Sequence, residues 1–122
     1  PEKYTEETPW GNFEQFCQNI PCTVKIVTLN PYEELSLQYH HHRRELWRVI
    51  TGTGTIIIGD KQKTAKAGDE FVVPKRVTHR IITEESPLQI MELSFGLFDE
   101  NDTIKLEDKH KRIKPMQQPV LI

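Results

Sequence analysis

The sequence lacks any long hydrophobic run, since no run of apolar side chains exceeds three residues. A membrane-spanning helix needs roughly 20 apolar residues and the core of a signal peptide about 7 to 15, so neither is predicted and we expect no membrane partner. An excess of one charge is also missing, because 16 Lys and Arg residues stand against 18 Asp and Glu. A nucleic-acid-binding domain usually carries a basic excess or a basic stripe, so the composition argues against a nucleic-acid partner.

Cysteine is scarce, with only Cys17 and Cys22 in 122 residues. The pair is compatible with a disulfide, with half of a metal site or with two free thiols. A zinc site would need a second Cys pair or a His close by in the sequence, and neither is present. A chain of this length buries roughly two thirds of its unfolded surface without a disulfide framework. We therefore expect free thiols in a reducing, cytoplasmic environment.

Helical periodicity is absent before the C-terminal tail, and short β-rich segments alternate with turn residues instead. The predicted strands cover residues 12–16, 23–29, 35–42, 45–50, 53–58, 61–65, 70–73, 79–83 and 88–95. Strands at this spacing predict a single all-β sandwich or barrel. We expect one domain over residues 1–112, followed by a C-terminal extension over 113–122. The core of the domain covers residues 9–96, and the tail of the domain at 97–112 is expected to pack on the outside of the barrel or to cross its mouth.

Three of the five histidines are consecutive in the middle of the chain. Alternation along a strand places Gln38, His40 and His42 on one face of that strand. Glu45 begins the next predicted strand, and His79 lies in a separate strand after a Gly-Asp turn and a proline. Such donors converging inside a small barrel predict mixed nitrogen and oxygen coordination of one divalent metal ion by Gln38, His40, Glu45 and His79. The residues leave open whether Gln38 or His42 completes the set.

Two spaced motifs around these residues resemble those of the cupin family. The first cupin motif, G-x5-H-x-H-x4-E-x6-G, is matched in every spacing by Tyr32, Gln38, His40, Glu45 and Gly52. The second motif, G-x5-P-x-G-x2-H-x3-N, is matched in the same way by Gly68, Pro74, Arg76, His79 and Thr83. Four motif positions differ here: Tyr32 and Arg76 replace glycine, Gln38 replaces histidine and Thr83 replaces asparagine. The resemblance implies an all-β fold, a single cupin jelly-roll β-barrel with a short C-terminal tail.

A narrower resemblance covers roughly residues 9–112. The stretch LSLQYHHHRRELW at residues 35–47 is similar to the L-S-L-Q-M-H-H-H-R-x-E-H-W pattern of type II mannose-6-phosphate isomerases, with further matches at 9–11, 77–80, 99–104 and 107–108. The sequence departs from the family at Ile26 for Arg, at Leu46 for His and at residues 110–112, where His-Lys-Arg replaces Tyr-Gly-Arg. In many relatives this domain follows a sugar-nucleotide pyrophosphorylase domain. Neither the length nor a Gly-rich loop provides one here, so we expect the cupin domain to stand alone.

The resemblance implies an enzyme that interconverts mannose 6-phosphate and fructose 6-phosphate and binds its metal through a Gln, His, Glu and His set. A divalent metal stabilises the charge that develops on the sugar oxygens. Zinc is our first choice, and iron, manganese, nickel and cobalt also accept such ligands. A general acid or base must also move a proton between C1 and C2, for which His42 and Glu92 are the candidates. Glu92 has an equal alternative as a solvated residue, because either face of its strand can point inward.

A phosphorylated hexose needs basic side chains for its phosphate. The residues that match the family are Lys25, Arg43, Arg80 and Arg112, although surface solubility accounts for most basic side chains. We assign Arg80 and Arg112, and after them Lys25, to the substrate, and we interpret Arg43 as a surface residue. Alternation turns Arg80 away from the metal if the histidine before it points inward. Trp47 is interpreted either as a ring that stacks on the sugar or as core filling.

Two other classes of function stay open. One is another cupin enzyme, such as a sugar epimerase or a metal-dependent oxygenase, which metal content and oxygen uptake would distinguish. The other is a sugar-binding module without catalytic activity. We also expect a homodimer, because pairing through an edge strand would remove an exposed sheet edge.

Overall fold

The computed structural model describes residues 3–97 and 99–107 of the chain. Regular structure in these residues is almost entirely β-strand, with one short 3-10 helix, η1 (Glu100–Asp102). The strands are β1 (Tyr4–Thr8), β2 (Gly11–Gln15), β3 (Thr23–Leu29), β4 (Leu37–His40), β5 (Arg43–Ile58), β6 (Lys61–Lys66), β7 (Glu70–Val73), β8 (His79–Ile82), β9 (Leu88–Gly96) and β10 (Thr103–Glu107). No helix in this part of the chain is long and apolar enough to cross a membrane.

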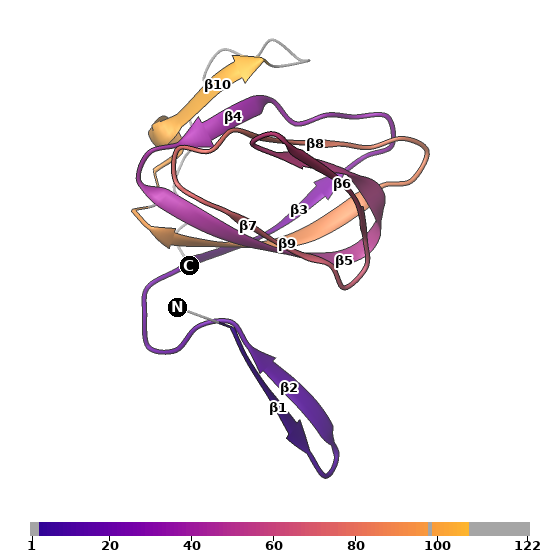
Figure 1. Ribbon diagram of the computed structural model, residues 1–122, viewed down its shortest axis with the longest axis vertical. Coiled ribbons are helices and arrows are strands. Elements are labelled where there is room, and N and C mark those ends of the chain that lie inside the picture. Colours follow the sequence, from indigo (N-terminus) through magenta and orange to yellow (C-terminus); the bar gives the residue numbers. More distant parts are fainter. Residues whose placement is uncertain (1–2, 98, 108–122) are drawn as a thin grey trace.

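Strands β3 to β10 form two facing layers that share the long strand β5 (Figure 1). The first half of β5 pairs with β7 and β9, and β9 pairs in turn with β3. The second half of β5 pairs with β6 and β8, β8 pairs with β4, and β4 pairs with β10. The path of paired strands therefore runs β10-β4-β8-β5-β9-β3, and no pairing among the described strands joins its two ends. The predicted all-β fold is confirmed, with an open seam between β3 and β10.

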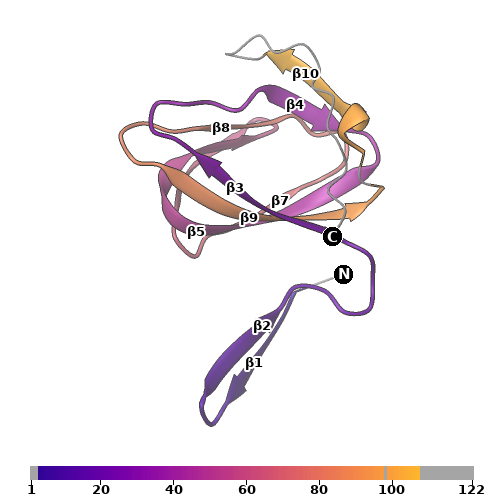
Figure 2. The same cartoon turned by 180° about the vertical axis from the view of Figure 1, so that it is seen from behind.

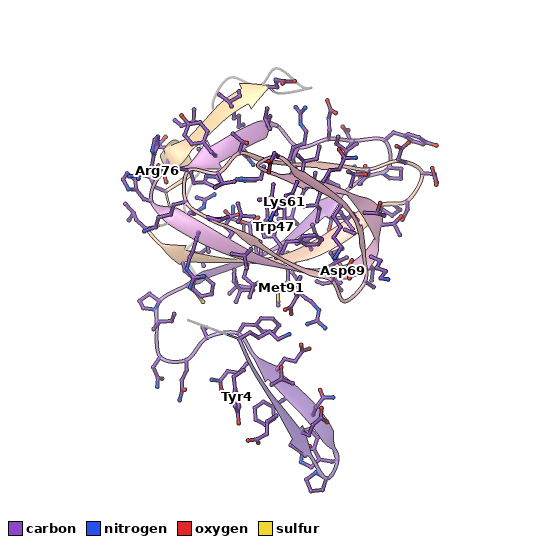
Figure 3. All side chains as sticks on the ribbon, viewed as in Figure 1. Tyr4, Trp47, Lys61, Asp69, Arg76 and Met91 are labelled. Carbon is purple, nitrogen blue, oxygen red and sulfur yellow. The ribbon has the colours of Figure 1, made fainter. Side chains whose placement is uncertain are left out.

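The inward face of β5 divides the interior into a polar and an apolar part. Every second residue from Arg43 to Val49 is buried, as alternation requires of a strand with one face on the core. This inward row begins with the charged Arg43 and Glu45 and continues with Trp47 and Val49, which belong to the hydrophobic core. Trp47 lies between the two layers (Figure 3) and is 1% exposed. The packed core therefore adjoins a polar end of the barrel.

Strand β5 is continuous, which corrects the prediction of two separate strands at 45–50 and 53–58. Its register against β9 shifts between Val49 and Thr51, and Gly52 has a φ of 87°. A β-bulge with a glycine at positive φ bends a strand without ending it, so the chain passes from one layer to the other. A glycine that signals a turn in the sequence thus serves here as a bend inside one strand.

Replacing Gly52 by alanine is expected to cost about 3 kcal/mol or more of unfolding free energy, because backbone strain and overpacking add. A Cβ at Gly52 would lie 1.9 Å from the carbonyl oxygen of Pro87. The matched control is Gly68→Ala, since Gly68 also has positive φ (92°) but open space around it, and only the cost of the left-handed backbone of about 1–2 kcal/mol applies. Denaturant unfolding measures both, and equal losses would contradict this account of the bend.

The N-terminal hairpin of β1 and β2 forms a separate two-stranded sheet that projects from the barrel (Figures 1 and 2). The predicted strand at 12–16 corresponds to β2, whereas β1 was not predicted. Ion pairs tie the hairpin to the barrel: Glu14 of β2 contacts Lys3 and Arg48, and both cations also contact Glu70. Because Arg48 and Glu70 belong to the barrel, this network fixes where the hairpin leaves it.

Strands β4 and β10 also differ from the sequence-based expectation. Only Leu37–His40 of the predicted strand at 35–42 is strand, because the chain bends after His40. Strand β10 falls within the expected tail and pairs with β4, beside which it lies in Figure 1. Residues 108–122, with the predicted extension at 113–122, lie outside the described residues.

The two residues that replace motif glycines both adopt the left-handed backbone region. The φ angle is 56° at Tyr32 and 64° at Arg76, which costs an L-residue about 1–2 kcal/mol. A backbone hydrogen bond holds each of them: the Tyr32 N–H donates to the Glu84 carbonyl at 2.7 Å, and the Arg76 N–H donates to the His40 carbonyl at 2.6 Å. The replacements therefore keep the backbone shape that glycine provides, and the turn before β8 stays tied to the end of β4.

The two cysteines lie in the connection between β2 and β3. Both are free, as predicted, and their sulfur atoms are 3.6 Å apart. Burial, together with the neighbouring Cys17, raises the pKa of the Cys22 thiol.

Candidate metal centre

Three side chains from three strands converge at the polar end of the barrel. His40 ends β4, Glu45 lies near the start of β5 and His79 begins β8, and each is at most 3% exposed. One ligand atom of each lies within 4.8 Å of those of the other two. The His40 Nε2 and Glu45 Oε2 atoms are 3.5 Å apart, and the two imidazole centroids are 5.0 Å apart. Two imidazoles and a carboxylate at such distances can hold a single divalent ion.

Hydrogen bonds to the outer nitrogen orient both imidazole rings. His79 Nδ1 lies 3.1 Å from the carbonyl oxygen of Val77, which only accepts, so this nitrogen carries the proton. His40 Nδ1 lies 3.2 Å from the hydroxyl of Thr103 on β10. Both contacts leave Nε2 as the ring nitrogen that can bind a metal ion, and the Nε2 of His40 lies 3.5 Å from Glu45 Oε2. Metal-binding histidines are oriented in this way by a partner on the other ring nitrogen, so the group fits a metal ion.

Glu45 is held by two donors from its own strand. Arg43 Nε donates to Glu45 Oε2 at 2.9 Å, and Trp47 Nε1 donates to Glu45 Oε1 at 2.9 Å. Arg43 Nη2 also lies 3.2 Å from His40 Nε2. The buried guanidinium therefore presents positive charge to the same acceptor atoms that a metal ion would bind.

The protonation states of the group suit metal binding. The pKa of His40 falls to about 4, because burial and the Arg43 guanidinium disfavour the charged ring. Burial also lowers the pKa of His79. Burial alone would raise the pKa of Glu45, but neighbours that include the Trp47 N–H and the Arg43 guanidinium hold it below its ordinary value. Neutral imidazoles and an ionised carboxylate are the forms in which these side chains bind metals.

A cavity of about 290 Å³ opens beside the three residues. Gln38 is half-buried, lines this cavity and stands directly opposite His79 in the β4–β8 register. All four predicted metal ligands thus line one cavity. The other lining residues are Lys25, Val27, Leu35, Ser36, Arg43, Trp47, Glu92, Thr103 and Lys105.

Glu92 of β9 points into the cavity, which decides between the two orientations that its strand left open. It stands opposite Lys25 of β3 and opposite Trp47 of β5. Its pKa is raised to about 7, first by burial and then by the charge of Glu45, against the opposing effect of Lys25 and Arg43. The Trp47 ring packs in the core and meets the His79 ring in a T-shaped arrangement, with the ring centroids 5.5 Å apart. Glu92 is therefore a second carboxyl in the same cavity as the candidate ligands.

His42 is not brought to the cavity, and the prediction that it shares the face of His40 is wrong. It lies in the bend between β4 and β5, it is exposed, and it is not among the lining residues. The carboxylate of the buried Asp102 accepts the backbone N–H groups of His41 (3.1 Å) and His42 (2.9 Å) and so holds this bend. Alternation counted through residues 41 and 42 fails because the strand has already ended.

The basic residues assigned to the substrate are placed differently from one another. Lys25 lines the cavity, as expected. Arg80 does not: its Nε donates to the Leu35 carbonyl at 3.2 Å and its Nη1 lies 3.4 Å from Glu107. Arg80 follows the inward His79, so alternation turns it outward, and we do not keep it as a substrate ligand. Arg112 lies outside the described residues.

Sequence reasoning did not assign Arg43, Thr103 and Lys105 to the site, although all three line the cavity. The interpretation of Arg43 as a surface residue, which rests on the solubility role of most basic side chains, is wrong: Arg43 is buried, because β5 begins at Arg43 and alternation places it on the same face as Glu45. Thr103 and Lys105 come from β10, which the sequence did not predict as a strand. The sequence signal for β10 is a short alternation of polar and apolar residues over Thr103–Glu107. In the structure its apolar side chains, Ile104 and Leu106, are the exposed ones.

Comparison with known proteins supports the sequence resemblance. The family model described as "Mannose-6-phosphate isomerase C-terminal" matches residues 2–108. The chain is 34% identical over 105 residues to mannose-1-phosphate guanylyltransferase 2 of Escherichia coli O157:H7, a match that covers 84% of this chain and 22% of that protein. It is also 34% identical over 106 residues to the alginate biosynthesis protein AlgA of Pseudomonas aeruginosa, which covers 85% of this chain and 22% of that protein. The chain thus spans less than a quarter of the length of these relatives.

Solved structures identify the fold as a cupin. A cupin protein from Bacteroides fragilis superposes with a TM-score of 0.57 at 19% identity, over 62% of this chain and 65% of that chain. A Cupin 2 conserved barrel domain protein from Salinispora arenicola superposes with a TM-score of 0.56 at 18% identity, over 75% and 74%. The predicted jelly-roll fold is therefore confirmed. Since the family model matches most of its length, the chain belongs to the mannose-6-phosphate isomerase C-terminal family.

Proposed function

We propose that the protein is a metal-dependent isomerase that interconverts mannose 6-phosphate and fructose 6-phosphate. The observation that carries the proposal is the convergence of His40, Glu45 and His79 beside a cavity that contains a further carboxyl, Glu92. Membership of the mannose-6-phosphate isomerase C-terminal family supports the choice of substrate. The volume of about 290 Å³ lies at the lower end of the range of small-molecule pockets, which is roughly 300–1,000 Å³.

A divalent metal held by Gln38, His40, Glu45 and His79 would supply Lewis-acid polarisation of the sugar oxygens at C1 and C2. Glu92 takes the proton from C2 of the aldose and returns it to C1, while the hydroxyl proton passes from the C2 oxygen to the C1 oxygen. A carboxyl with a pKa near 7 suits both directions of this transfer. Trp47 holds Glu45 through its N–H and lines the cavity.

The proposal is tested by a coupled assay that detects fructose 6-phosphate formed from mannose 6-phosphate. The protein is stripped with EDTA and reloaded separately with zinc, manganese, cobalt, nickel and ferrous iron. We expect no turnover in the stripped protein and restored turnover with at least one metal. Sugar phosphate binding without turnover under every metal would overturn the isomerase and favour a sugar-binding cupin without catalytic activity.

The homodimer and the cytoplasmic location predicted from the sequence are carried forward as proposals. The outward aliphatic side chains of Val24 and Ile26 on β3, which are 55% and 63% exposed, support a second copy as a partner. The free thiols of Cys17 and Cys22 support a reducing compartment.

A further inference from the structure

A segment near the end of the described chain, residues 99–103, contacts the candidate metal ligand His40. This segment contains η1 and the first residue of β10. Thr103 stands directly opposite His40 in the β10–β4 register, and its hydroxyl lies 3.2 Å from His40 Nδ1 across a sequence separation of 63 residues. The other imidazole of the group, His79, instead has its Nδ1 beside the carbonyl of Val77, two residues away. The orientation of the His40 ring therefore depends on a part of the chain that lies far outside the motif around it.

The contacts on the two nitrogens of the His40 ring agree on one tautomer. Arg43 Nη2 lies 3.2 Å from His40 Nε2, and a guanidinium can only donate, so Nε2 is the acceptor and carries no proton. A ring with Nε2 as acceptor is neutral and carries its proton on Nδ1, which then donates to the Thr103 hydroxyl. The ring nitrogen that lies 3.5 Å from Glu45 Oε2 is therefore the one free to bind a metal ion.

The same segment holds the backbone that follows β4. The carboxylate of Asp102, which is 9% exposed, accepts the backbone N–H groups of His41 at 3.1 Å and of His42 at 2.9 Å. Hydrogen bonds from backbone N–H groups to an ionised carboxylate are stronger than those between neutral groups. Undocking residues 99–103 would therefore remove a partner of the His40 ring and the support of the bend after it at the same time.

Apolar burial contributes little to the docking of β10. Its two aliphatic side chains, Ile104 and Leu106, are 36% and 54% exposed. Among the described strands β10 pairs with β4 only, at one end of the strand path, and it lies at the rim of the barrel in Figure 1. A strand held mainly by backbone pairing and a few polar contacts belongs to the part of a fold with low local stability. A ligand that binds only when β10 is docked would therefore stabilise its docking measurably.

We propose that Asp102 and Thr103 are positioning residues of the metal centre, and that docking of β10 and binding of a divalent metal ion stabilise each other. With β10 docked, His40 is held with Nε2 free for the ion; with β10 undocked, the ring and the bend lose these partners and the affinity for the ion falls. Linkage makes the effect reciprocal, so the ion shifts the protein toward the docked form by the same factor. This inference deepens the proposed function and rests on its metal centre, but not on its sugar substrate.

Binding of cobalt to the full chain, stripped of metal, is followed by visible absorption for the wild type, Thr103→Val and Thr103→Ser. Valine keeps the shape of threonine without the hydroxyl, and Thr64→Val is the matched control at an exposed position on β6. Thr103→Val is expected to weaken cobalt binding about 10- to 100-fold and to alter the ligand-field bands, as loss of a partner on a metal-binding histidine does. Thr103→Ser and Thr64→Val are expected to bind like the wild type. Asp102→Ala is expected to show the same loss as Thr103→Val, against Asp60→Ala as a control in the exposed turn before β6.

The reciprocal effect is measured on the wild type without any substitution. Hydrogen exchange of the backbone amides is followed by NMR in the metal-free protein and in saturating zinc. We expect zinc to slow exchange in β10 about 10- to 100-fold, the factor by which undocking weakens the site. The amides of the β1–β2 hairpin, which projects away from the barrel in Figures 1 and 2, are the internal control and are expected to exchange at an unchanged rate.

The proposal is overturned if Thr103→Val binds cobalt as tightly as Thr64→Val, or if zinc binds the wild type and leaves exchange in β10 unchanged. Either result leaves the metal centre of the proposed function in place. A wild type that binds neither cobalt nor zinc overturns the metal centre and the positioning role together. Metal-dependent protection of β10 in a protein that shows no turnover of mannose 6-phosphate would support the positioning role and remove the isomerase.

Discussion

Replacing Glu92 by glutamine is expected to lower kcat about 10²- to 10⁴-fold, the range that a positioned acid–base group contributes. The amide preserves the size of the side chain but cannot accept the proton from carbon. Metal content and KM are expected to stay near their wild-type values, because Glu92 lines the cavity outside the group of His40, Glu45 and His79. Steady-state kinetics with mannose 6-phosphate measures this effect.

Glu85→Gln is the matched control for Glu92→Gln, since it removes the same charge from an exposed position ahead of β9. A second readout is the incorporation of deuterium from D₂O into the recovered sugar, which reports the proton transfer itself. We expect both turnover and deuterium incorporation to be lost together in Glu92→Gln. If Glu92→Gln keeps the kcat of the Glu85 variant, another group moves the proton.

Replacing Arg43 by alanine is expected to destabilise the metal-free protein by about 3–5 kcal/mol, the cost of breaking a buried ion pair by removing one partner. The side chains of Arg43 and Glu45 are only 3% and 2% exposed, and they lie 2.9 Å apart. Without the guanidinium, the Glu45 carboxylate stays buried without that cation. Added zinc should recover part of the loss, because the metal again places positive charge beside Glu45. Denaturant unfolding in EDTA and in zinc measures both parts.

Arg44→Ala provides the comparison for Arg43, because Arg44 is the next residue and lies on the other face of β5. Its guanidinium lies 4.8 Å from the centre of the Phe95 ring, so its loss should cost only about 0.5–1 kcal/mol, and zinc should not change that cost. Equal losses in the two variants, or a loss in Arg43→Ala that zinc leaves unchanged, would contradict the view that Arg43 neutralises the metal-binding carboxylate.

Much of the candidate site could be predicted because short-range spacing and strand alternation control it. Glu45 and Trp47 share a face in β5, and Gln38 and His40 share a face in β4. The match to both motifs then placed His79 beside them, and Gln38 and His79 are indeed direct neighbours across β4 and β8. Strand alternation relates residues that lie close together in the sequence. The two cupin motifs relate residues that are far apart, because their match to the family implies the same pairing of strands.

The parts that failed depend on contacts between distant residues. His42 left the inward face because Asp102, 60 residues later, accepts its backbone N–H and holds a bend. Lys105 reaches the cavity only because β10 pairs with β4, a pairing that no local pattern indicates. Gly52 could be recognised as a break in the pattern, but the sequence does not show that the backbone of Pro87, 35 residues later, packs so closely against it that a Cβ has no room.

The most direct test of the account is the number of zinc ions bound per chain, measured by plasma mass spectrometry after dialysis against zinc and then against buffer. Wild type is compared with His40→Ala and His79→Ala, and His42→Ala serves as the control because it removes an exposed imidazole from the bend outside the cavity. The account predicts one zinc ion per chain in the wild type and in His42→Ala, and loss of the ion in the two other variants. Metal retained equally in all four proteins, or absent from the wild type, would contradict the assignment of His40, Glu45 and His79 as the metal centre.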